Sequence, residues 1–269
     1  MKRRRPDWRG LVMLGLSLAA CLALLIHGPI PQDAAYHGFA DQRPYWGIPN
    51  GVDTFSNLAF LVVGLAGLYA LRRGVPAGGL APLRPAYALF FAGAALLFPT
   101  SGYYHLWPDN AGLAWDRLAM TISFMAFFAS ILGEHVSPRL GARLLLPLIL
   151  LGILSVVYWR LTDQGDGGDL RLYLLVQFLP MLLVPFILLT FPSRLRPTGY
   201  LWAVIGWYLL AKGLESLDEP LLNLTGLVSG HSLKHLAAAL GIASFLLALY
   251  RRRPDPESRV RISPPAELT

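Results

Sequence analysis

The sequence is poor in cysteine and in charged residues. Cys21 is the single cysteine among 269 residues, which excludes a disulfide framework and any metal or iron–sulfur site built on several thiolates. Only 14% of the residues are charged and 55% are hydrophobic, whereas soluble domains carry about 25% charged residues. Most of the surface must therefore face a lipid bilayer, and a bound metal would need His, carboxylate or hydroxyl ligands.

Several functional motifs are also missing. The chain has no phosphate-binding glycine loop, no dinucleotide-binding fingerprint and no nucleophile elbow of a Ser-His-Asp hydrolase. The formal charge is +7, but the basic residues are dispersed among the predicted loops rather than gathered on one solvated face. This pattern excludes a nucleic-acid partner.

Apolar runs recur along the chain and predict an all-α polytopic membrane protein with eight spans, or seven as the fallback. A span usually needs about 20 residues, and two of the runs are shorter. The first run follows a basic start and is too long for the apolar part of a signal peptide, so it is expected to be a retained helix. The expected spans are 10–28, 54–71, 87–107, 115–133, 144–158, 172–191, 200–214 and 231–250.

The distribution of Lys and Arg predicts the orientation, because short cytoplasmic loops are enriched in these residues. Loops rich in Lys and Arg alternate along the chain with loops that hold few of them. This alternation favours an even number of spans. Both termini are then cytoplasmic. The poor set is Arg43, Arg117, Arg160 and Arg171, and the rich set is Lys2, Arg3, Arg4, Arg5, Arg9, Arg72, Arg73, Arg84, Arg139, Arg143, Arg194, Arg196, Arg251, Arg252, Arg253, Arg259 and Arg261.

The linkers are short and no flexible hinge divides the chain, so we expect one membrane domain. Residues 1–35 would hold the basic cytoplasmic start and an extra helix, and residues 36–250 the main helical domain. Residues 251–269 combine prolines with charges and are expected to be a disordered cytoplasmic tail.

Ionisable residues within membrane spans are costly, so each one suggests a function. Ser101 and His105 are four residues apart and share one helix face. Asp116 opens the next span, and His231 and His235 have the spacing that lets two imidazoles of one helix share a metal. The predicted topology places all of these residues on the non-cytoplasmic side.

Three histidines with one open position form the usual ligand set of catalytic zinc. Asp116 would take a proton from the attacking water, and Ser101 would bind that water or the oxyanion of a tetrahedral intermediate. Simpler interpretations remain open: Asp116 can cap a helix, Ser101 can bond to a carbonyl of its own helix, and the histidines can be interfacial or can ligate haem.

Other polar residues are weaker candidates. His27, His37 and His135 are expected in solvated loops and are excluded as ligands. Lys212 and Glu215 are three residues apart and can form an ion pair beside the site, with Asp218 just beyond. The loop at 163–169 lacks the pattern of a calcium-binding EF-hand and is expected to be a solvated turn.

Three motifs of the chain resemble the alkaline ceramidases and the wider superfamily of seven-helix membrane hydrolases that includes adiponectin-receptor-like proteins. They are Ser101-x-x-x-His105 followed by Asp116, Gly230-His231-x-x-x-His235 at the last span, and the run Asp53-Thr54-Phe55-Ser56-Asn57. The resemblance covers about residues 36–250.

This resemblance implies a seven-helix hydrolase core preceded by one extra helix. It also implies zinc held by His105, His231 and His235, with Asp116 and Ser101 as catalytic residues and a long-chain lipid amide such as ceramide as the substrate. The chain departs from the family at its calcium site, where only Asp41, Asn50 and Asp53 are nearby, so the resemblance does not imply calcium dependence for this chain. The alternative is a non-catalytic membrane receptor or carrier that binds haem or a metal through the same histidines.

Overall fold

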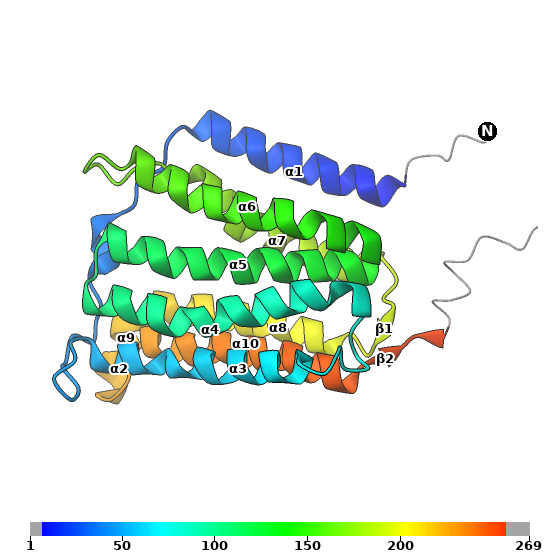
Figure 1. Cartoon of the computed structure of the whole chain (residues 1–269). Coiled ribbons are helices and arrows are strands. Elements are labelled where there is room, and N and C mark those ends of the chain that lie inside the picture. Colours follow the sequence, from blue (N-terminus) through cyan, green and yellow to red (C-terminus); the bar gives the residue numbers. More distant parts are fainter. Residues whose placement is uncertain (1–6, 257–269) are drawn as a thin grey trace, which may run out of the picture.

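The computed structural model describes residues 7–256, and it is a bundle of long, nearly parallel helices (Figure 1). The basic residues 2–5 and tail residues 257–269 lie outside the described part. The α-helices are α1 (Trp8–His27), α2 (Gly51–Ser56), α3 (Leu58–Leu71), α4 (Arg84–Leu106), α5 (Asn110–His135), α6 (Pro138–Thr162), α7 (Arg171–Thr190), α8 (Gly199–Ser216), α9 (Asp218–Thr225) and α10 (Gly230–Arg251). Shorter elements are the 3-10 helices η1 (Ala34–His37) and η2 (Ala81–Leu83) and the strands β1 (Leu195–Arg196) and β2 (Arg253–Pro254).

Seven helical segments are long and apolar enough to cross a membrane. An all-α polytopic membrane protein is therefore confirmed for the described residues. The number of apolar spans among these residues is seven, the second of the two predicted values, rather than eight. The span expected at 200–214 corresponds to α8, which carries Lys212 and Glu215 and does not reach the required hydropathy. The span expected at 144–158 lies within α6, which is longer than expected. This helix already begins at Pro138, since the first turn of a helix tolerates proline.

Six helices surround a central cavity: α3, α4, α5, α7, α8 and α10. Helix α5 is the most buried of the apolar segments, since α4, α6 and α7 all pack against it. Helix α1 buries no residue within the chain and lies outermost, against α7 (Figure 1). Its apolar side chains therefore face the surroundings of the bundle, as expected for a helix in lipid.

The end of the bundle that carries most of the basic residues is closed by a buried ion pair. The Arg252 guanidinium at the end of α10 donates to the Glu134 carboxylate of α5 at 2.6 and 2.8 Å, and both side chains are fully buried. Strands β1 and β2 pair beside it. Residues 251–256, the described part of the predicted disordered tail, thus pack against the bundle.

The opposite end is covered by the 28–50 segment, which links α1 to α2 (Figure 1). Leu170 at the start of α7 donates to the carbonyl of Ile30 at 2.8 Å, and Gln32 donates to the carbonyl of Gly167 at 2.9 Å. After residue 35, the Ala40 N–H donates to the Asp218 carboxylate at 3.1 Å and Arg43 donates to the carbonyl of Gly226 at 2.9 Å. The segment therefore contacts the main bundle on both sides of residue 35. The predicted division between residues 35 and 36 stays a prediction.

Candidate metal centre

Three buried histidines from two helices meet beneath this cover. One ring nitrogen each of His105, His231 and His235 lies within 4.8 Å of the others. The ring centroids are 4.9 to 5.2 Å apart. The sequence prediction that these residues come together is therefore confirmed, and their spacing suits a shared metal ion.

The hydrogen bonding of the rings leaves nitrogen atoms free for a metal. Both ring nitrogens of His105 are buried and have no hydrogen-bond partner among the described residues. Buried polar atoms are normally paired, so a bare imidazole between two others is best explained by a ligand that all three share. The residues present thus fit a divalent ion that accepts imidazole nitrogen, but they do not select zinc over other such ions.

Ser56 fixes the tautomer of His235. The Ser56 hydroxyl donates to the carbonyl of Asp53 at 2.7 Å, and the same oxygen lies 2.7 Å from Nδ1 of His235. Because the Ser56 O–H already donates to this carbonyl, the Ser56 oxygen must accept a hydrogen bond from Nδ1–H of His235. This leaves the lone pair of Nε2 on His235 for a metal, the usual arrangement around a ligating histidine.

Asp53 and Asp218 hold the start of α10 in place. The buried Asp53 carboxylate accepts hydrogen bonds from Ser229 at 3.0 Å and from Ser232. Asp218 accepts from the backbone N–H of His231 at 2.8 Å. Gly230 allows this approach, since a Cβ there would lie 2.2 Å from the carbonyl oxygen of Leu214.

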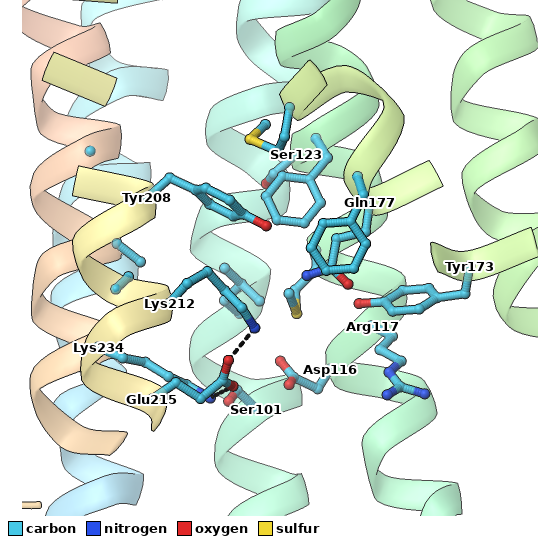
Figure 2. A pocket seen from close by; sticks show the side chains of 18 of the residues that line it. Ser101, Asp116, Arg117, Ser123, Tyr173, Gln177, Tyr208, Lys212, Glu215 and Lys234 are labelled. Atoms are coloured by element: carbon cyan, nitrogen blue, oxygen red, sulfur yellow. Dashed lines mark hydrogen bonds and ion pairs between the residues drawn. The ribbon is translucent and has the colours of Figure 1, made fainter. Parts of the chain in front are cut away.

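Asp116 and Ser101 line the same cavity as His235, and Figure 2 shows both side chains facing it. Their side chains interact by a hydrogen bond. Helix α5 begins at Asn110 and is capped by Asp109, so Asp116 is not a capping residue. Within residues 7–256, Ser101 makes no hydrogen bond to a carbonyl of its own helix, and both simpler interpretations are therefore wrong.

The cavity next to these residues has a volume of about 440 Å³. Its walls are mostly aromatic and aliphatic. Charged groups gather at the level of Ser101, and Ser123, Gln177 and Tyr208 add polar groups further along the cavity (Figure 2). Lys212 and Lys234 both form ion pairs with Glu215, the second at 2.7 Å, as Figure 2 shows. The predicted Lys212–Glu215 pair is confirmed, and Lys234 joins it as a residue that sequence reasoning did not select.

The 28–50 segment closes the outer side of the centre. The Phe39 ring lies 4.6 Å from that of His105 and 4.9 Å from that of His231. Nearby, Arg43 binds Asp41 through two side-chain hydrogen bonds of 2.8 Å, which hold the pKa of the Asp41 carboxyl below its usual value. Phe39 and Ser56 are two parts of the site that sequence reasoning missed. Ser56 belongs to the run 53–57, which resembles the ceramidase motif, so this motif could have pointed to it. No motif or spacing in the sequence points to Phe39.

The histidines excluded as ligands lie apart from the three. His27 is exposed at the end of α1, and His37 bonds to Tyr104 and Asn110 at 3.0 Å. The expectation of a solvated His135 is wrong, because this residue ends α5 and is 4% exposed. The loop at 163–169 is also less solvated than expected: Asp169 is buried and pairs with Arg171.

No family model matches the chain, and no curated protein is significantly similar to it. The function must therefore be argued from the site.

Proposed function

We propose that the protein is a membrane-embedded, metal-dependent amidase that cleaves the N-acyl bond of a long-chain lipid of the ceramide type. The observation that carries this proposal is that three buried histidines are spaced to share a metal ion, and that one of them, His235, lines an apolar cavity together with Asp116 and Ser101. A haem or carrier site has no need of Asp116 and Ser101 beside the histidines.

His105, His231 and His235 would hold the ion. When bound, a divalent ion in such a set supplies Lewis acidity, which polarises a carbonyl and activates water. Zinc is the ion that this ligand set most often holds in hydrolases.

Asp116 is the general base in this proposal. Its carboxylate faces the cavity that His235 also lines (Figure 2) and can take a proton from water that attacks the acyl carbon. The same carboxyl group can return the proton to the amine as the C–N bond breaks. Ser101 keeps Asp116 in place by its hydrogen bond and offers a hydroxyl to the developing oxyanion.

The cavity suits a lipid that arrives from the bilayer. Phe178 of α7 lines the cavity and is 44% exposed, so the cavity wall on this helix reaches the surface of the bundle. Residues of α8, such as Tyr208, line the cavity opposite α7 (Figure 2). The 28–50 segment covers the outer end. A long acyl chain would therefore enter between α7 and α8, with its amide toward the histidines.

Replacement of Asp116 by Asn tests the proposal. We expect fatty-acid release from a long-chain ceramide in detergent to fall by about 10² to 10⁴-fold, while the metal content stays unchanged. Asp166→Asn, in the exposed loop before α7, is the matched control and should retain activity. Full turnover by Asp116→Asn would remove this residue from the mechanism, and absence of amide hydrolysis by the metal-loaded wild type would contradict the proposed function.

A further inference from the structure

Arg117 is a buried cation in the cavity that the proposed mechanism does not use. It follows Asp116 on α5, lines the same cavity and is 6% exposed. The guanidinium carbon lies 4.3 Å from the ring centre of Trp159 and 4.5 Å from that of Tyr173. These aromatic faces stabilise a cation, but they do not neutralise its charge.

No carboxylate of residues 7–256 forms an ion pair with Arg117. One guanidinium nitrogen, Nη2, donates to the side-chain carbonyl of Gln32, and the other, Nη1, is buried without a partner. The one other buried arginine of residues 7–256, Arg252, differs because it pairs with Glu134, and the half-buried Lys234 shares Glu215 with Lys212. Because an unpaired charge in a membrane domain is costly, the exception at Arg117 needs an explanation.

The position of Arg117 in the cavity indicates which part of a bound substrate it would contact. Figure 2 shows Arg117 at the same level as Asp116 and Ser101. Gln32 and Tyr36 of the covering segment line the cavity there. The apolar walls formed by Phe90, Phe127 and other residues lie on α4 and α5 further along the cavity. An acyl chain would occupy the apolar part, which leaves Arg117 for the group attached to the amide nitrogen.

We propose that Arg117 binds an oxyanion on the amine side of the lipid amide, so that the preferred substrate is an acidic N-acyl lipid. This inference rests on the proposed amidase function and specifies its substrate class. A carboxylate, as in an N-acyl amino acid, and a phosphate, as in an N-acyl phosphoethanolamine, offer the same chemistry to a guanidinium. The reaction itself is unchanged: water adds to the acyl carbon, the C–N bond breaks, and the amine leaves with its acidic group.

Matched substrates that share one acyl chain test this inference. We would compare N-dodecanoylglycine and N-dodecanoylphosphoethanolamine with the neutral N-dodecanoylethanolamine. A charge-assisted hydrogen bond predicts that wild-type kcat/KM is higher for at least one acidic substrate by about tenfold or more. The substrate that is preferred identifies carboxylate or phosphate as the source of the oxyanion. Equal or faster cleavage of the neutral amide would overturn the inference and leave the amidase intact.

The variant Arg117→Gln should lose this preference, mainly through a higher KM for the acidic substrate, and Arg117→Lys should keep part of it. Arg160→Gln, at the end of α6 and outside the cavity lining, is the control and should keep the wild-type ratio. A purely structural role of Arg117 would change all three substrates alike, which would overturn the inference.

Binding provides a readout that does not depend on catalysis. N-dodecanoylglycine or N-dodecanoylphosphoethanolamine should raise the Tm of purified wild type more than the neutral amide does, and Arg117→Gln should abolish the difference. If the wild type hydrolyses neither these three amides nor ceramide, the proposed function fails, and this shift alone decides whether Arg117 binds an oxyanion. Equal shifts with all three compounds would then overturn the inference.

Discussion

The hydroxyl of Ser56 determines the tautomer and the orientation of the His235 ring. The Ser56 hydroxyl donates a hydrogen bond to the carbonyl of Asp53, so its oxygen accepts a hydrogen bond from Nδ1–H of His235. The ring is thereby held with Nε2 toward the other two histidines. In the same way, Asn50 donates to the carbonyl of His105 at 2.8 Å and fixes the end of α4. The metal-binding geometry thus depends on residues of the 28–50 segment and α2 that would not touch the ion.

Ser56→Ala tests this orientation. The variant removes the acceptor for Nδ1–H, and metal affinity should fall by about 10- to 100-fold, as for other partners of ligating histidines. Competition with a chelator of known affinity would measure the change. Ser17→Ala in α1, where the hydroxyl bonds only to the carbonyl of Met13, is the control. Equal metal affinity in Ser56→Ala and wild type would show that another contact orients His235.

At the scale of elements, the sequence predicts most of the helices and the meeting of the three histidines, but not the residues that hold these histidines in place. Apolar runs locate the long helices, and the i, i+4 spacing selects His231 and His235. The length of α6 was underestimated because its ends are polar. Phe39 was missed because the packing of a loop over a site leaves no periodic pattern, and only the three-dimensional fold brings it onto the histidines.

The close approach of α10 to α8 and α9 places two of the three ligands. Gly230→Ala would bring a Cβ within 2.2 Å of the carbonyl of Leu214, so α10 must shift. We expect stability to fall by about 1–3 kcal/mol, a typical cost of overpacking, and metal affinity to fall with it. Thermal unfolding in detergent measures the first effect.

Gly206→Ala in α8 provides the contrast, because a Cβ there would meet nothing within 4 Å. Alanine is the better helix former by about 1 kcal/mol, so this variant should match or exceed wild-type stability. If both variants unfold at the wild-type temperature, the close approach at Gly230 has been overestimated.

At the scale of the whole molecule, each end of the bundle has a separate role. The end with the metal centre is closed by the 28–50 segment. The other end is locked by Glu134 and Arg252, and Tyr87 also donates to Glu134 at 2.7 Å. This network joins α4, α5 and α10, the helices that carry Ser101, Asp116 and all three histidines. It therefore holds these three helices together at the end opposite the candidate metal centre.

Glu134→Gln should destabilise the bundle strongly, because it leaves a buried guanidinium without its counter-ion. The expected loss is about 3–5 kcal/mol, measured by thermal unfolding. Arg196→Gln breaks the pair with Asp255, in which the arginine is 61% exposed, and should cost less than about 1 kcal/mol. Similar losses in both variants would contradict the role of the buried network.

The most direct test of the account is the metal content of purified protein. Elemental analysis would compare wild type with His231→Ala and with His27→Ala, which removes an exposed histidine at the end of α1. Fatty-acid release from a long-chain lipid amide would be assayed on the same samples. We predict about one divalent ion per chain in wild type and in His27→Ala, and loss of both metal and hydrolysis in His231→Ala. Wild-type protein that holds no metal after purification in metal-supplemented buffer would contradict the account.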